Sequence, residues 1–328
     1  MRANWFAAGA AAGLIGAALV PCIAGAQSPA SYPVKQVRVV IPWPPGGSND
    51  IVGRVVFQKL SQTVGQQFVI DNRPGAAGSI GADVVAKAPA DGYTLMVHST
   101  THVGNGTLYR KLPYDVLKDF RPVILLAAQP GAMVVHPSLP VKTVREFIAL
   151  AKQRPGQITY SSSGNGSAPH MQMALFIGST GVDVVHVPYK GGPPAVTAIV
   201  SGETQVMLAT IATVIPHVQS KRLRAVAVTG AKQTKVLPGL PTIAESGVAG
   251  YEMDPWIMVF APGNTPREIV DVINERLNAV LRQPDVAQNL FTQALDPLGG
   301  SADEAAKRAE ADFHKYAKLI KLTNARVE

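Results

Sequence analysis

The sequence has one cysteine, few aromatic residues and no region where charge of one sign is concentrated. Because Cys22 is the only cysteine, disulfides within the chain and cysteine-ligated metal sites are excluded. Aromatic residues make up 6% of the chain, and its net charge of +8 is spread along it. A nucleic-acid-binding surface usually carries a stripe of lysine and arginine interleaved with aromatic residues. We therefore expect no nucleic-acid partner, and the dispersed positive charge favours a small anionic ligand instead.

Motifs for nucleotide cofactors, metals and hydrolysis are missing or incomplete. No loop has the Walker sequence with Gly-Lys-Ser/Thr, and none reads Gly-x-Gly-x-x-Gly. From the seven histidines we predict no metal site. Ser79 lies in Ala77-Gly78-Ser79-Ile80-Gly81, a degenerate nucleophile elbow, but the sequence does not place a histidine and an acid beside it. We expect a binding protein without cofactor or catalysis, and a periplasmic serine hydrolase stays an alternative.

The long apolar run of the sequence is at its N-terminus. Arg2 precedes apolar residues from Trp5 to Val20, Pro21 breaks the run, and Ala24-Gly25-Ala26 follows as a small-x-small site. This order is typical of a cleavable signal peptide, here residues 1–26, and the run is shorter than the roughly 20 residues of a membrane span. We therefore expect a periplasmic protein. Cleavage removes Cys22, so thiol catalysis is excluded as well, and Pro21 disfavours lipidation of that cysteine.

Short β-type runs alternate with helical patterns along the rest of the chain. Strands are predicted at 37–41, 67–71, 93–97, 158–160, 184–187, 206–208 and 223–229. Helices are predicted at 50–64, 79–88, 144–154, 169–179, 194–201, 267–281 and 301–321, the last with a capping box of Ser301 and Glu304. This alternation predicts an α/β fold with parallel-rich sheets flanked by helices. The length suits two lobes.

Four glycine-rich loops follow predicted strands and precede helices, at 44–50, 73–79, 161–167 and 189–194. Glycine allows tight turns and close approach of a ligand to the backbone. A helix start offers unpaired N–H groups and the positive end of a dipole, which together bind anions. In open α/β sheets, ligands bind beyond the carboxyl ends of the strands, where these loops lie. Two such loops in each lobe predict a carboxylate site between the lobes.

The candidate ligand-binding residues lie in these loops and after the third strand. Trp43 stands between two prolines at a strand end, so we expect it to contact ligand. His170 is expected to orient the 163–167 loop, and Asp50 to shape its own loop, since a carboxylate would repel a carboxylate ligand. The full set is Trp43, Pro45, Gly46, Gly47, Ser48, Gly75, Ala76, Gly78, Ser79, Ser99, Thr100, Ser163, Gly164, Gly166, Ser167, His170, Tyr189, Lys190 and Gly191.

In their order along the chain, these segments resemble the Bug family of extracytoplasmic solute receptors, the receptor components of tripartite tricarboxylate transporters. The resemblance covers the chain from Tyr32 to the C-terminal helix. It rests on Pro45-Gly46-Gly47 with Asp50, Asn72-Arg73-Pro74-Gly75 with Gly78, Asp91-Gly92-Tyr93-Thr94-Leu95, Ser163-Gly164-x-Gly166-Ser167 with His170, Val187-Pro188-Tyr189-Lys190-Gly191, Leu237-Pro238-x-x-Pro241-Thr242-x-x-Glu245-x-Gly247, Trp256 and Ala261-Pro262-Gly263-Asn264-Thr265-Pro266.

The resemblance implies a two-lobed periplasmic binding protein of the Venus-flytrap, type II-like kind, whose cleft closes over a carboxylate. Lobe 1 would comprise residues 32–131 and 253–328, and lobe 2 residues 132–252. The partners would be the membrane subunits of the transporter, and we expect a monomer. Ala209 stands where the family commonly has an acidic residue, which favours a di- or tricarboxylate or an aromatic acid over an amino acid. A ligand-sensing receptor for a signalling protein would share the fold and stays an alternative.

Overall fold

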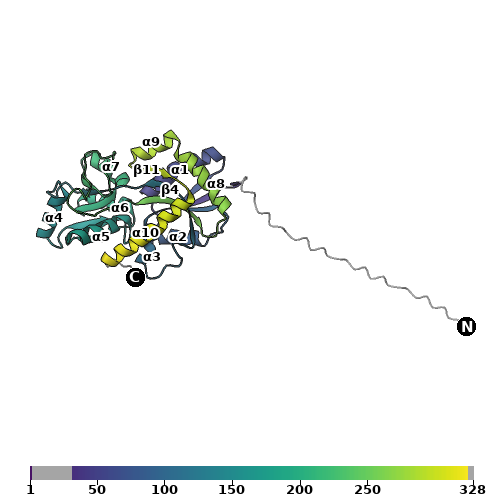
Figure 1. The fold of residues 1–328 in the computed structure, drawn as a ribbon, viewed down its shortest axis with the longest axis horizontal. Helices are drawn as coiled ribbons and strands as arrows, with labels where there is room; N and C mark the ends of the chain where they lie inside the picture. Colours follow the sequence, from purple (N-terminus) through teal and green to yellow (C-terminus); the bar gives the residue numbers. More distant parts are fainter. Residues whose placement is uncertain (2–31, 324–328) are drawn as a thin grey trace.

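The structure is a computed structural model that describes residue 1 and residues 32–323, so the predicted signal peptide lies almost wholly outside the described residues. Two α/β lobes lie next to each other (Figure 1). The α/β architecture predicted from the strand–helix alternation is confirmed. In the described part of the chain, no helix combines the length and the apolar character that crossing a bilayer requires.

Lobe 1 is built on a six-stranded sheet with the order β11-β4-β10-β3-β1-β2. Its strands are β1 (Val37–Ile41), β2 (Phe68–Asn72), β3 (Thr94–Ser99), β4 (Phe120–Ala128), β10 (Trp256–Pro262) and β11 (Asp296–Gly299). Its helices are α1 (Ser48–Val64), α2 (Ser79–Ala86), α3 (Thr101–Leu108), α8 (Arg267–Leu281), α9 (Pro284–Thr292) and α10 (Ala302–Thr323), with a 3₁₀ turn at Ala76–Gly78.

Alternation along the strands puts helices on both faces of this sheet. Val39 and Ile41 of β1 point into a core shared with α1, α8 and α9, whereas Val40 points into a core shared with α2, α3 and α10. Because successive strand side chains face opposite ways, a strand that is buried on both faces reads as the continuous apolar run seen in the sequence.

Lobe 2 is built on a five-stranded sheet with the order β7-β6-β8-β5-β9. Its strands are β5 (Gly131–Val135), β6 (Thr159–Ser162), β7 (Val185–Pro188), β8 (Val206–Thr210) and β9 (Arg224–Val228). Helices α4 (Val144–Gln153) and α5 (Ala168–Thr180) cover one face, and α6 (Gly192–Ser201) and α7 (Ile211–Gln219) cover the other.

Both sheets are mixed, whereas the alternation of strands and helices alone suggested parallel pairing. β1, β2 and β3 are parallel, as are β6, β7 and β8, but β10 and β5 run antiparallel to both of their neighbours. β4 and β5 follow each other without a helix between them, but they belong to different sheets, β4 to that of lobe 1 and β5 to that of lobe 2. These strands carry the chain between the lobes.

The chain crosses between the lobes twice, and the two crossings are hydrogen-bonded to each other. Gln129 N–H donates to the carbonyl of Pro255 at 2.8 Å, and Thr229 N–H donates to the carbonyl of Gly131 at 2.9 Å. Helix α10 begins on lobe 1 and ends against lobe 2, where Tyr316, Leu319 and Ile320 pack into the same core as Phe147 and Phe176 (Figure 1). The C-terminal helix therefore contacts both lobes.

Candidate functional site

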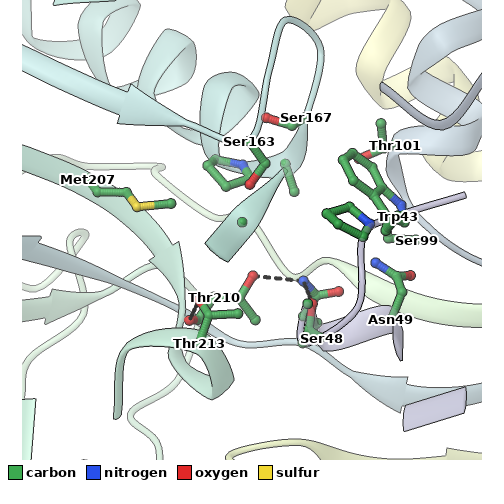
Figure 2. A pocket seen from close by; sticks show the side chains of 16 residues that line it. Trp43, Ser48, Asn49, Ser99, Thr101, Ser163, Ser167, Met207, Thr210 and Thr213 are labelled. Carbon is green, nitrogen blue, oxygen red and sulfur yellow. Dashed lines mark hydrogen bonds between the residues drawn. The ribbon is translucent and has the colours of Figure 1, made fainter. Parts of the chain in front are cut away.

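A small pocket lies between the lobes, and the glycine-rich loops of both lobes contribute to it. We call it the inner pocket. It has room of about 40 Å³ for the centres of water-sized molecules. Figure 2 shows Ser163 and Ser167 on one side, Ser48 and Asn49 opposite them, and Thr210 and Thr213 on a third side. Its lining residues are Trp43, Pro44, Gly47, Ser48, Asn49, Ser99, Thr101, Gln129, Ser163, Ser167, Ala168, Pro169, Gly192, Met207, Thr210 and Thr213.

Two helices, one from each lobe, begin at the inner pocket. Helix α1 starts at Ser48 after Gly47, and helix α5 starts at Ala168 after Ser167. The first-turn N–H groups of a helix have no partner within the helix, and neither preceding residue caps them with its side chain. Both helix ends therefore offer backbone donors and a positive dipole end to the same small volume.

Asp50 fixes the loop that leads into α1. Its carboxylate accepts hydrogen bonds from Gly46 N at 2.9 Å, from Asn72 Nδ2 at 2.9 Å and from Arg54 Nε at 2.9 Å. Burial opposes the charge of this carboxyl, but the hydrogen bonds from Arg54, Gly46 and Asn72 outweigh it and hold the pKa of Asp50 below its usual value. The negative charge is thus balanced beside the loop, and Asp50 does not line the pocket.

Gln129, in the first crossing between the lobes, connects the two sides of the inner pocket. Its Nε2 donates to Ser48 Oγ at 2.8 Å and to Thr210 Oγ1 at 2.7 Å, so one amide group holds a hydroxyl from each lobe. The residue is 4% exposed, and its Oε1 has no hydrogen-bond partner within the described structure. The glycine pattern gave no indication of Gln129, Thr210 or Thr213.

Trp43 forms the wall between the inner pocket and a larger outer cavity. The residue lines both cavities, and it is only 8% exposed. Its Nε1 donates to His98 Nδ1 at 3.5 Å, and the two rings meet edge to face. His98 Nδ1 also accepts from Ser99 N at 2.8 Å. Burial, followed by the neighbouring His102, holds the pKa of His98 well below its usual value, so His98 is a neutral support for the indole.

His98 and His102 are four residues apart, a spacing that zinc-binding pairs use. Both are fully buried, and His102 Nε2 hydrogen-bonds the carbonyl of Val116 at 3.1 Å. Over residue 1 and residues 32–323, no three histidine, cysteine or acidic side chains are grouped so that they could hold a metal ion.

The outer cavity opens beyond Trp43 and is about 670 Å³ by the same measure. Lys190 carries the one charged side chain among the residues that line either cavity. The residues that line the outer cavity are Trp43, Pro44, Pro74, Gly75, Ala76, Ala77, Gly78, Tyr109, Ser163, Gly164, Asn165, Tyr189, Lys190 and Gly191.

The two lobes touch at two places near these cavities. A Cβ on Gly191 would overlap the ring of Pro44 across the cleft, and a Cβ on Gly166 would overlap the side chain of Leu108. Gly191 has a φ of +112°, which other residues rarely adopt. The structure therefore has the lobes in contact over the inner pocket, and glycine is required where the loops meet.

Comparison with known proteins identifies the family. Residues 52–325 match the family model described as the tripartite tricarboxylate transporter family receptor. The chain belongs to this receptor family. The resemblance to the Bug proteins is thereby confirmed, and BugT of Bordetella pertussis is 32% identical over 309 residues, which cover 93% of this chain and 94% of BugT.

Solved structures of similar proteins have the same two-lobed fold. The R. palustris protein Rpa4515 with adipate has a TM-score of 0.86 and 38% identity, over 89% of this chain and 98% of that one. MatC from Rhodopseudomonas palustris with bound malate has a TM-score of 0.84 and 29% identity, over 88% of this chain and 100% of that one. The predicted fold of a periplasmic binding protein is confirmed.

The predicted site residues of the receptor divide into three groups. Trp43, Gly47, Ser48, Ser99, Ser163 and Ser167 line the inner pocket. Gly75, Ala76, Gly78, Gly164, Tyr189, Lys190 and Gly191 line the outer cavity, as do Trp43 and Ser163. Pro45, Gly46, Ser79, Thr100, Gly166 and His170 line neither.

Several residues of the third group support the site instead of lining it. Thr100 Oγ1 accepts from the backbone N–H of Trp256 at 2.9 Å, which ties the end of β3 to β10. His170 Nδ1 accepts from Gly166 N at 2.9 Å, which is the loop-orienting contact expected for it. In the described part of the receptor, no hydrogen bond joins Ser79 to a histidine, so the elbow-like sequence has no base bound to its hydroxyl.

His170 and His186 stack beneath the 162–167 loop. Their rings lie 4.3 Å apart and nearly parallel, and His186 Nε2 is 2.6 Å from Ser162 Oγ. Burial lowers the pKa of each to about 4, and His170 adds to this effect on His186. Both imidazoles are therefore neutral near pH 7, which leaves His170 Nδ1 free to accept from Gly166.

Proposed function

We propose that this receptor captures a small dicarboxylate in the periplasm and presents it to the membrane subunits of a tripartite transporter. The observation that carries the proposal is that α1 and α5, from different lobes, begin at one pocket lined by neutral donors and no acidic side chain. The predicted signal peptide supports the periplasmic location. The function is binding without catalysis.

One carboxylate of the ligand occupies the inner pocket. Each water needs roughly 10–15 Å³ of such space, so about 40 Å³ corresponds to a few waters. A carboxylate with its attached carbon replaces that number of waters. The hydroxyls of Ser48 and Thr210 and the first-turn N–H groups then serve as donors, and the two helix dipoles favour its negative charge.

The rest of the ligand extends past Trp43 into the outer cavity. There Lys190 is the one positively charged residue among those that line the outer cavity. One positive charge suits a ligand with one further carboxylate better than a ligand with two. An aromatic monoacid would leave Lys190 without a partner. The similar proteins crystallised with adipate and with malate hold dicarboxylates, which supports the same class here.

Ligand binding and lobe closure are coupled in this proposal. Donors come from both lobes, so the ligand gains its full set of hydrogen bonds only when the cleft is shut. A ligand shifts a conformational equilibrium by its differential affinity for the two states, and this ligand favours the closed one. The membrane subunits then recognise the closed, loaded form.

The test is a thermal-shift and calorimetry panel on the purified protein with succinate, glutarate and adipate, each beside its diamide. A ligand at 100 times its dissociation constant stabilises the fold by about 2.7 kcal/mol, which a thermal shift detects readily. We expect at least one diacid to bind and its diamide to fail, because the amide carries no charge for the helix dipoles to favour. Equal binding of an acid and its diamide would contradict the proposal.

A further inference from the structure

One wall of the outer cavity is a turn with a strained backbone. Four consecutive residues of this turn have positive φ, with +136° at Gly75, +45° at Ala76, +49° at Ala77 and +89° at Gly78. Glycine adopts such angles readily, but alanine rarely does, because its Cβ crowds the backbone there. Two consecutive alanines in this region persist only where the surrounding structure holds them. All four residues line the outer cavity, so the shape of its wall depends on what holds the turn.

Asn105, in helix α3, holds this turn by a hydrogen bond. Its Nδ2 donates to the backbone carbonyl of Ala77 at 3.0 Å. Because a carbonyl oxygen only accepts hydrogen bonds, this contact fixes which end of the amide faces the turn. Asn105 is fully buried and lines neither cavity. It therefore acts on the cavity wall and not on a bound ligand directly.

The sequence of α3 fits this role. Gly104, Asn105 and Gly106 are consecutive poor helix formers within a helix of 8 residues. Packing accounts for the two glycines, since a Cβ on either would lie 2.8 Å or less from a neighbouring side chain. Asparagine brings no apolar group to the core, and its hydrogen bond to the Ala77 carbonyl accounts for its place in the helix.

We propose that Asn105 is a positioning residue of the ligand site, which keeps the Gly75–Gly78 turn in the strained conformation that forms the outer wall. The other lobe takes part, because a Cβ on Gly166 would lie 3.6 Å from Asn105 Oδ1. Contact between the lobes thus helps to keep water from the hydrogen bond, which strengthens it. The effect on ligand affinity rests on the proposed function, whereas the effect on the turn does not.

The effect on the turn is measured by amide hydrogen exchange of the ligand-free protein. Gly78 N–H donates to the carbonyl of Gly75 at 2.9 Å, so its protection reports whether the turn is intact. Asn105→Ala should speed this exchange at least tenfold. The control is Asn274→Ala, because Asn274 Nδ2 in α8 also donates to a backbone carbonyl, at 2.8 Å, but lines neither cavity. It should leave Gly78 unchanged. An unchanged rate in Asn105→Ala overturns the proposal.

The effect on the ligand is measured by calorimetry with succinate, glutarate and adipate. Without the hydrogen bond the turn leaves its strained conformation, so the binding-competent fraction of the protein falls and the affinity falls in proportion. For the acid that the wild type binds most tightly, we expect about tenfold weaker binding by Asn105→Ala. We expect no change in Asn274→Ala. Equal binding by the wild type and Asn105→Ala overturns the positioning role.

Ala77→Gly separates positioning from a general structural role. Glycine adopts the left-handed conformation without strain, so in this background Asn105→Ala should weaken binding no more than about threefold. A loss as large as in the wild-type background overturns the proposal. If Asn105→Ala does not fold, Asn105→Ser, whose side chain is too short to reach the Ala77 carbonyl, replaces it in both backgrounds. If none of the three acids binds the wild type, the proposed function fails, and the exchange of Gly78 still decides whether Asn105 holds the turn.

Discussion

The two lobes present equivalent helix ends to the inner pocket but hold the preceding loops by opposite chemistry. In lobe 1 an ionised carboxylate, Asp50, accepts from Gly46 and is balanced by Arg54. In lobe 2 a neutral imidazole, His170, accepts from Gly166 and is stacked on a second neutral imidazole. The loop of each lobe, together with the group that holds it, therefore brings no net charge to the inner pocket. The attraction for an anion is left to helix dipoles and hydroxyl donors, which lose little strength in a water-poor pocket.

The largest expected effect comes from removing the charged support of lobe 1. Asp50→Ala leaves Gly46 N–H, Asn72 and Arg54 without their acceptor, and a lost buried network of this kind destabilises by about 2–4 kcal/mol. We expect urea unfolding to show that loss and calorimetry to show no ligand binding.

Asp83→Ala is the matched control for Asp50→Ala. Asp83 is also an acid paired with a basic residue four positions along the chain, Lys87, but its side chain is 28% exposed against 5% for Asp50, and it lines neither cavity. Such surface pairs contribute about 0.2–1 kcal/mol. A similar loss of stability in both variants would contradict the loop-holding role of Asp50.

The second-largest effect is expected from a substitution at the contact between the lobes. Gly191→Ala places a methyl group against Pro44 across the cleft, so closure is obstructed and we expect affinity to fall about 10- to 100-fold. Gly181→Ala is the control, because Gly181 also has a left-handed backbone, with φ of +66°, but nothing lies within 4 Å of the added methyl. Both variants carry backbone strain, and only Gly191→Ala should lose affinity. Equal affinity in the two would show that the lobes need not touch there.

The pH dependence of stability distinguishes the residues that hold the two loops, Asp50 in lobe 1 and His170 with His186 in lobe 2. His170 and His186 have folded pKa values of about 4 against an ordinary value near 6.5, so the unfolded chain takes up protons first as the pH falls. Their contribution to the free energy of unfolding is complete above pH 6.5 and is lost between pH 6.5 and 4. The pKa of Asp50 is lowered, so its contribution is lost only at more acid pH, below about 4.

The measurement compares urea unfolding of the wild type and His170→Asn at pH 7 and pH 5. Asparagine keeps a hydrogen-bonding side chain that does not titrate. Between pH 7 and pH 5, the free energy of unfolding of the variant should therefore fall by on the order of 1–2 kcal/mol less than that of the wild type. The buried His98 and His102 titrate in the same direction, but they are present in both proteins and cancel in the difference. An identical pH dependence in the two proteins would exclude His170 as a neutral support.

Most of the fold and much of the site were predictable because their signals are local. Strand–helix alternation and glycine spacing located the loops that contain Gly47, Ser163 and Ser167. β4, β5 and β10 were missed because no crossover helix marks them. Gln129 and Thr210 were missed because nothing near either in sequence indicates that Gln129 bonds both Ser48 and Thr210, contacts that exist only once the chain has crossed between the lobes.

The smallest expected effect compares the inner pocket with the outer cavity through Lys190. Lys190 is exposed, so its attraction for a second carboxylate is weakened by water and screened by salt. Lys190→Met keeps most of the aliphatic stem and removes the charge. We expect affinity for a dicarboxylate to fall about three- to tenfold at low salt and the salt dependence of binding to weaken.

The matched control for this last change is the ligand itself. A monocarboxylate of the same chain length uses the inner pocket alone, so its affinity should be the same in the wild type and in Lys190→Met. Two ligands and two proteins form a thermodynamic cycle. Lys190→Met changes the binding free energy of each ligand, and the difference between these two changes is the interaction energy of Lys190 with the second carboxylate. Equal losses for both acids would mean that Lys190 acts on the first carboxylate or on the shape of the cavity. In that case the second carboxylate would have to be bound by backbone donors of the glycine-rich loops that line the outer cavity.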